Sequence, residues 1–202
     1  MDKIQEITAS DAPILRLYRR LWQPARYAHP NWFIGMGFHP PLCWQYGRYP
    51  VMDRILNEAL RRRRGTPRLT ERAGQPKAES FREANYLETL ALALGLLMLN
   101  CKDYFLLPAY RQTLSQRVND VILWQLFGLC TGVKRAVFTP QTLQQQATEI
   151  GLAGLYRIAE KDAALYASLV ALPPRARALR PGVSRRTFNL LEQVLCANEN
   201  FL

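Results

Sequence analysis

The chain has 202 residues, 49% of them hydrophobic, and carries 27 Lys and Arg against 16 Asp and Glu, a formal net charge of +11. This length suits one domain with a sizeable core, and the apolar share excludes an intrinsically disordered chain. The positive balance would suit nucleic acid, an anionic membrane face or an acidic protein, and charge alone does not choose among these partners.

The sequence indicates neither export nor membrane insertion. The first 13 residues are polar and lack the apolar core of a signal peptide. The longest apolar run, Leu90 to Leu99, has ten residues, whereas a membrane-spanning helix needs about 20. The four cysteines form no CxxC pair, and we interpret them as reduced and mostly buried in a cytosolic protein. They are Cys43, Cys101, Cys130 and Cys196.

The N-terminal part, residues 1–50, is expected to be irregular and packed on a helical bundle. Apolar residues at helical spacing predict a short helix over 14–22, which ends before Pro24. Residues 23–50 are rich in proline, which breaks helices and sheet ladders. Their aromatic side chains belong either to the core or to a partner-binding face, for which Trp32 and Phe33 are the candidates. The aromatic residues are Tyr27, Trp32, Phe33, Phe38, Trp44, Tyr46 and Tyr49.

A helix is predicted over 51–64, with Met52, Ile55, Leu56, Ala59 and Leu60 on its apolar face. It runs into the arginines Arg61, Arg62, Arg63 and Arg64. Residues 65–79 contain Gly, Pro and charge, and we expect a flexible basic loop there. Between 61 and 77 there are seven Lys and Arg against one Glu. The arginine run is either a docking site for an acidic partner or a solvated helix end favoured by the helix dipole.

The rest of the chain also indicates helices. Ser80 and Glu83 have the spacing of a capping box, which would open a helix that reaches Asn100 and is apolar on nearly all sides. The helix predicted after Pro108 either continues through Val121 or is split at Asn119-Asp120, which would cap a new helix over 121–129. Further helical segments are predicted in a Gln-rich turn at 140, over 150–159, over 163–172, which continues or follows the one before it, and after Ser184. No stretch shows sustained strand alternation. We therefore predict an all-α fold, one compact bundle of about seven or eight helices that forms a single domain over 1–202.

No constellation of catalytic or metal-binding residues is indicated. His29 and His39 both precede proline, and with Cys43 they have a spacing unlike that of common zinc sites. The Gly35-Met36-Gly37 stretch lacks the third glycine of a dinucleotide site. We predict no enzyme, no catalytic, cofactor-binding or metal residue, no cofactor and no small-molecule substrate. An enzyme of unrecognised type, with a polar pocket around either histidine, stays a third hypothesis.

Two stretches carry a resemblance to a known family. The first is a Pro-Ala-x-Tyr segment over 24–32, Pro24-Ala25-Arg26-Tyr27-Ala28-His29-Pro30-Asn31-Trp32. The second begins at the Leu-Gly-Leu helix Leu92-Ala93-Leu94-Gly95-Leu96-Leu97-Met98-Leu99, continues through Leu129 and reaches Gly151-Leu152-Ala153. In these stretches the chain resembles the SctK family, the cytosolic sorting-platform adaptors of bacterial type III secretion systems.

The resemblance implies a helical cytoplasmic subunit, without a cofactor, at the cytosolic face of the inner membrane. Such a subunit bridges the cytoplasmic domain of the inner-membrane ring protein to the pod protein, and it is peripheral to the membrane through a protein partner. Our first hypothesis is this non-enzymatic adaptor. The alternative is a basic nucleic-acid-binding or regulatory protein, which is less favoured because the aromatic residues of 27–49 lie apart from the arginine run.

Overall fold

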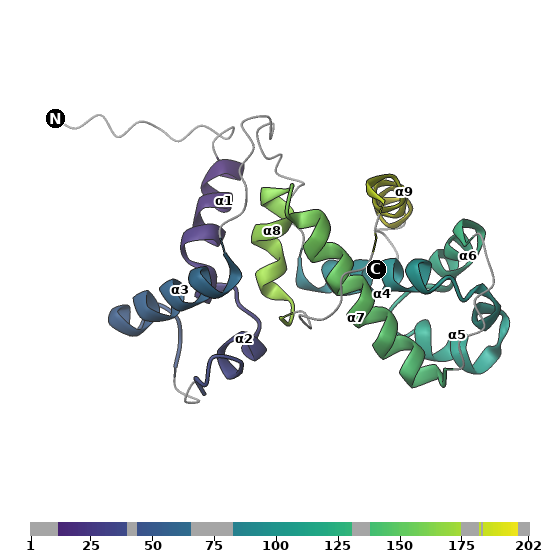
Figure 1. Cartoon of the computed structure of the whole chain (residues 1–202), viewed down its shortest axis with the longest axis horizontal. Coiled ribbons are helices and arrows are strands. Elements are labelled where there is room, and N and C mark those ends of the chain that lie inside the picture. Colours follow the sequence, from purple (N-terminus) through teal and green to yellow (C-terminus); the bar gives the residue numbers. More distant parts are fainter. Residues whose placement is uncertain are drawn as a thin grey trace. The chain divides into compact units, whose positions relative to one another are not determined.

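The computed structural model describes residues 12–39, 44–65, 83–130, 138–174, 182 and 184–197. These residues form nine α-helices and short 3-10 turns, with no strand among them (Figure 1). The predicted all-α class is therefore confirmed, with slightly more helices than expected. In the described ranges, no helix has the length and apolar character needed to cross a membrane. The predicted loop over 65–79 lies outside the described residues, apart from Gly65.

The chain divides into two compact units, which we describe separately. The first unit comprises Met1–Ala84 and Ala159–Pro174, and the second comprises Asn85–Ile158 and Arg175–Leu202. The prediction of a single domain over 1–202 stays a prediction.

The first unit is built around α3, α1 and α8. Its helices are α1 (Ala12–Trp22), α2 (Pro30–Ile34), α3 (Pro50–Arg64) and α8 (Ala163–Ser168), with the 3-10 turns η2 (Pro24–Arg26) and η5 (Leu169–Ala171). Pro24, Pro30 and Pro50 each begin a helical element, where the missing N–H has no helical partner to lose. Helix α1 packs against α8 and α3, and α3 packs against η2.

Buried contacts hold the proline- and aromatic-rich segment within the first unit. The backbone N–H of His29 donates to the Val170 carbonyl at 3.0 Å, and the indole N–H of Trp32 donates to the Leu172 carbonyl at 2.9 Å. Phe33 packs edge-on against the rings of Phe38 and Trp44, with centroid distances of 6.1 and 5.4 Å. The segment is thus short helical turns fixed by long-range contacts.

Helix α3 contributes a buried amide that joins two parts of this segment. Asn57 is 8% exposed. Its Oδ1 accepts from the backbone N–H of Ala25 at 2.9 Å, and its Nδ2 donates to the Tyr46 hydroxyl at 3.0 Å. Because both ends of the amide are used, Asn57 fixes the turn around Tyr46 and the η2 turn against the same helix.

We expect Asn57→Ala to lower the free energy of unfolding by about 1–3 kcal/mol, because the buried N–H of Ala25 would lose its acceptor. Urea unfolding followed by circular dichroism measures the loss. The matched control is Asn31→Ala, since Asn31 is an exposed asparagine in the same unit. Equal unfolding midpoints for the two variants would contradict this role for Asn57.

The second unit surrounds a central apolar helix. Its helices are α4 (Ala84–Leu99), α5 (Pro108–Leu114), α6 (Asp120–Leu129), α7 (Pro140–Ala159) and α9 (Arg185–Cys196), with the 3-10 turn η4 (Lys102–Leu106). From Leu87 to Leu96, α4 is buried at almost every position, as its apolar sequence predicts. The expected cap of this helix, Ser80, lies outside the described residues.

Two sequence expectations in this unit are resolved by the helix boundaries. The chain does break before α6, where the Asn119 side chain accepts from the backbone N–H of Val121 at 2.7 Å. The prediction of separate helical segments at 140 and 150 is wrong, because α7 is one continuous helix of 20 residues. Its Gln-rich half contains no proline or glycine that would interrupt it, and glutamine is a good helix former.

Helices α4 and α7 meet with their backbones in direct contact (Figure 1). A Cβ atom added at Gly95 would lie 1.7 Å from the carbonyl oxygen of Ala147, and one added at Gly151 would lie 1.7 Å from that of Ala91. Only glycine allows the helices to approach so closely. The glycines of the two family-like stretches over 92–99 and 151–153 are therefore the two halves of one helix crossing.

Candidate functional site

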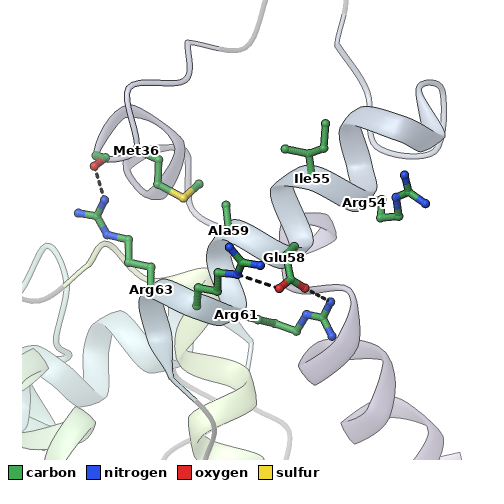
Figure 2. A pocket seen from close by; sticks show the side chains of 9 residues that line it. Met36, Arg54, Ile55, Glu58, Ala59, Arg61 and Arg63 are labelled. Carbon is green, nitrogen blue, oxygen red and sulfur yellow. Dashed lines mark hydrogen bonds and ion pairs between the residues drawn. The ribbon is translucent and has the colours of Figure 1, made fainter.

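The last three turns of α3 and the turn that follows α2 form an open pocket of about 970 Å³ (Figure 2). Residues spaced three and four apart on a helix share a face, which brings the α3 side chains together. We call this feature the α3 pocket. Its lining residues are Gly35, Met36, Arg54, Ile55, Glu58, Ala59, Arg61, Arg62 and Arg63.

The α3 pocket is positively charged. Among its described lining residues, four arginines face one glutamate, an excess of three positive charges. Glu58 pairs with Arg61 at 2.6 Å and with Arg62 at 2.9 Å. Ion pairs that are this exposed contribute only about 0–1 kcal/mol to stability. A partner carboxylate could therefore join or replace Glu58 without disturbing the fold.

The four arginines of the predicted run have different surroundings. The Arg61 guanidinium lies over the Trp22 ring, 4.9 Å from its centroid. Arg64 lies 4.4 Å from the Tyr166 ring centroid and donates to the Tyr166 backbone carbonyl. Arg62 is more exposed than Arg61, with 79% of its side chain accessible against 33%. Arg63 is also exposed and donates to the carbonyl of Gly35 (Figure 2).

The end of α3 is thus fastened to α8. The Tyr166 hydroxyl donates to the Gly65 carbonyl at 2.5 Å, directly after the arginine run. Burial raises the pKa of the Tyr166 phenol, while the nearby Arg64 guanidinium opposes that rise. Arg64 and Tyr166 therefore hold the helix end, and Arg62 and Arg63 are the members of the run that face solvent. The partners Trp22 and Tyr166 carry no local sequence signal, since they lie far from the arginines in the chain.

Trp32 and Phe33 lie in the interior of the first unit, 5% and 4% exposed. They do not line the α3 pocket. They support it indirectly, because the backbone N–H of Met36 donates to the Phe33 carbonyl at 2.9 Å. Core packing is thus the role that the structure gives these side chains, and direct contact with a partner stays a prediction.

The predicted apolar face of α3 is only partly buried. Leu56 and Leu60 are 4% and 0% exposed, but Ile55 is 54% exposed, and Val51 is 66% exposed. Ile55 shares the predicted apolar face but stays exposed, because the neighbours of α3 cover a narrower stripe of the helix. Ile55 instead provides an apolar side chain at the α3 pocket.

The second unit carries its own exposed apolar residues, which we call the α6 patch. Val121 and Trp124 of α6 are 47% and 48% exposed, and Leu106 and Leu107 are 53% and 46% exposed at the end of η4, which packs against α6. The Arg111 guanidinium lies 5.2 Å from the Trp124 ring centroid. Contiguous exposed apolar surface is typical of protein-interaction sites, and these side chains are the candidates for such a surface in the second unit.

In the part of the chain that the structure describes, no group of three His, Cys, Asp or Glu side chains converges as the ligands of a metal ion would. His29 caps α2, with its Nδ1 accepting from the Asn31 backbone at 3.1 Å. Cys101 and Cys130 are buried, Cys196 is exposed, and Cys43 lies outside the described residues. Burial raises the pKa of the Cys130 thiol to about 11, with a smaller contribution from Cys101, so this thiol is protonated at neutral pH.

A family model described as a type III secretion system subunit matches residues 15–174. The chain belongs to this family. The matched range of this type III secretion subunit extends from α1 to the end of η5 and contains every residue of the α3 pocket and of the α6 patch, whereas α9 lies beyond it. No curated protein and no solved structure matches the chain significantly.

Proposed function

We propose that this type III secretion subunit is a non-enzymatic adaptor of the sorting platform, of the SctK type. It bridges the cytoplasmic domain of the inner-membrane ring protein and the pod protein through protein–protein contacts. It lies in the cytoplasm at the inner membrane and reaches the membrane only through its protein partner. The observation that carries this proposal is the family match over residues 15–174, which places the chain within the secretion apparatus.

Exposed side chains of the two units support a docking role. An adaptor that joins two proteins needs two contact surfaces. The first unit has the arginine-lined α3 pocket, and the second has the exposed apolar residues of the α6 patch, Trp124 among them. Arg and Trp are enriched among the residues that contribute most to binding at interfaces.

Co-purification tests the adaptor role. A tagged copy of the chain, produced in secretion-competent cells of its own source, is expected to recover the ring protein and the pod protein together. In cells that lack the chain, the pod protein should no longer be recovered with the ring protein. A ring–pod complex that persists without the chain would show that the bridging role is wrong.

The net charge of +11 favours nucleic acid as the alternative partner. Binding to duplex DNA would weaken steeply with salt, with a log–log slope of about −0.9 for each phosphate contacted. A gel-shift titration at low and high salt measures this slope. We expect no shift at physiological salt. A specific shift there, together with failure to recover ring or pod protein, would favour the nucleic-acid function.

A further inference from the structure

We propose that the α3 pocket binds an acidic protein segment in which an aliphatic side chain lies between carboxylates. This inference rests on the adaptor function proposed above and names the chemistry of one of its partners. The partner segment would place the aliphatic side chain against Ile55 and Ala59 and its carboxylates against the surrounding arginines.

The apolar residues of the pocket support a contact with an aliphatic side chain of the partner. Ile55 and Ala59 of α3 and Met36 of the opposite turn lie among the pocket's guanidinium groups (Figure 2). Ile55 is 54% exposed. A bound aliphatic side chain would remove this apolar surface from water, which favours association. A purely electrostatic site would not need an exposed isoleucine among its lining residues.

The arginines of the pocket support binding of the partner's carboxylates. Arg62 donates to Glu58 through its Nε, and a guanidinium has five N–H donors in total, so donors on its outer edge can face a partner. Arg54 is exposed about two turns before Arg62 on the same helix. Arginine binds carboxylates through paired, parallel hydrogen bonds. Glu58 holds the Arg61 and Arg62 guanidinium groups in place, so less side-chain freedom is lost when a carboxylate binds.

Gly35 lets the opposite wall of the pocket come close to α3. A Cβ atom at this position would lie 3.1 Å from an Nη atom of Arg63 and 3.2 Å from the Asn31 carbonyl oxygen. These distances are shorter than most real Cβ contacts. Because Gly35 has no side chain, the Arg63 guanidinium can donate a hydrogen bond to the Gly35 carbonyl and still lie along the edge of the pocket. There it adds to the positive charge.

A protein segment fits the pocket better than nucleic acid does. Single-stranded nucleic acid is usually bound by aromatic side chains on which the bases stack. None of the described residues that line the pocket is aromatic. The ring of Trp22, beside the pocket's Arg61, is already covered by the Arg61 guanidinium, which lies 4.9 Å from its centroid. An excess of three charges within one concavity also suits a short segment rather than a long regular polyanion.

Fluorescence anisotropy on the full-length chain tests the proposal directly. The probe is a fluorescein-labelled peptide of Glu and Asp with one central Leu, and the comparison peptides carry Ser in place of Leu or Lys in place of the acidic residues. We expect the Leu peptide to bind, the Ser peptide to bind several-fold more weakly, and the Lys peptide not to bind. Equal affinity for the Leu and Ser peptides would overturn the apolar part of the proposal.

Paired charge reversals locate the binding site. Arg54→Glu with Arg62→Glu is expected to lower the affinity for the Leu peptide by at least about tenfold, through like-charge repulsion at the pocket. The control, Arg16→Glu with Arg186→Glu, makes the same change in net charge at exposed positions outside the pocket. The control should bind almost normally, and equal losses in both double variants would overturn the assignment to the pocket. Ile55→Ser provides a variant that leaves every charge in place, and unchanged affinity in it would also count against the pocket.

Competitors separate the other polyanions. The competitors are an oligonucleotide and phosphatidylserine vesicles. If either displaces the labelled peptide at a lower concentration than unlabelled peptide does, and the effect depends on the same arginines, the choice of a protein segment would be overturned. Failure of every acidic peptide to bind would overturn the inference about the pocket. The adaptor function would still stand if the ring and pod proteins were recovered with the chain, so the two failures are distinguishable.

Discussion

Replacing Gly151 with alanine is expected to lower the free energy of unfolding of the second unit by at least about 3 kcal/mol. Overpacking a core usually costs about 1–3 kcal/mol, so this loss lies at or above the top of that range. The new Cβ atom would lie 1.7 Å from the Ala91 carbonyl oxygen and 2.7 Å from the Gly95 nitrogen. Both are backbone atoms of α4, so no flexible side chain can move aside. The helices must separate, and buried leucines along α4 then lose contacts with α7.

Gly128→Ala is the matched control for this prediction. Gly128 lies in α6 of the same unit, and a Cβ atom there would meet nothing within 4 Å. Alanine is the better helix former, so we expect a gain of about 0.5–1 kcal/mol in the free energy of unfolding. Urea unfolding measured by circular dichroism should give opposite signs for the two variants. If Gly151→Ala were as stable as the unchanged protein, the close helix crossing would be wrong.

Much of the fold could be predicted from local sequence signals. Proline marks the beginning of α2 and of α3, and Gly65 ends α3 with a positive φ of 81° that glycine tolerates. Ser184 caps α9, where its hydroxyl accepts from the Arg186 backbone at 3.2 Å. These signals act within one turn of the chain. The continuity of α7 is hard to predict because glutamines dominate its polar half, although Leu143 and Ala147, both 0% exposed, lie four residues apart on one helix face.

The candidate site could be predicted only in part. The charge of α3 can be read from the arginine run, and the end of the helix from Gly65. Which arginines of the run are held by aromatic rings and which face solvent depends on Trp22 and Tyr166. These two residues contact the run from distant parts of the chain. The exposure of Ile55 depends likewise on which neighbours cover α3. Tertiary contacts, rather than helix propensity, therefore decide which side chains line the α3 pocket.

Trp32→Ala is expected to lower the free energy of unfolding of the first unit by about 3–5 kcal/mol, as is usual when a buried tryptophan is removed. Trp32 is 5% exposed, and its indole N–H donates to the Leu172 carbonyl at 2.9 Å. That bond joins α2 to the end of η5 across 140 positions of the chain. The substitution therefore removes both a large apolar side chain and a link between two distant segments.

Two further variants separate these contributions and test a binding role for Trp32. Trp32→Phe keeps most of the apolar volume but leaves the Leu172 carbonyl without this donor, and we expect a loss of about 1–3 kcal/mol. Trp22→Ala removes a tryptophan that is 58% exposed and stacked under Arg61, a contact worth about 0.5–1 kcal/mol at an exposed site. Thermal unfolding should rank Trp32→Ala as the least stable, then Trp32→Phe, then Trp22→Ala. The contrary outcome is that Trp32→Ala keeps the unfolding midpoint of the unchanged protein but no longer binds the secretion partners. Trp32 would then be a direct partner contact, because removing a surface side chain leaves the core beneath it undisturbed.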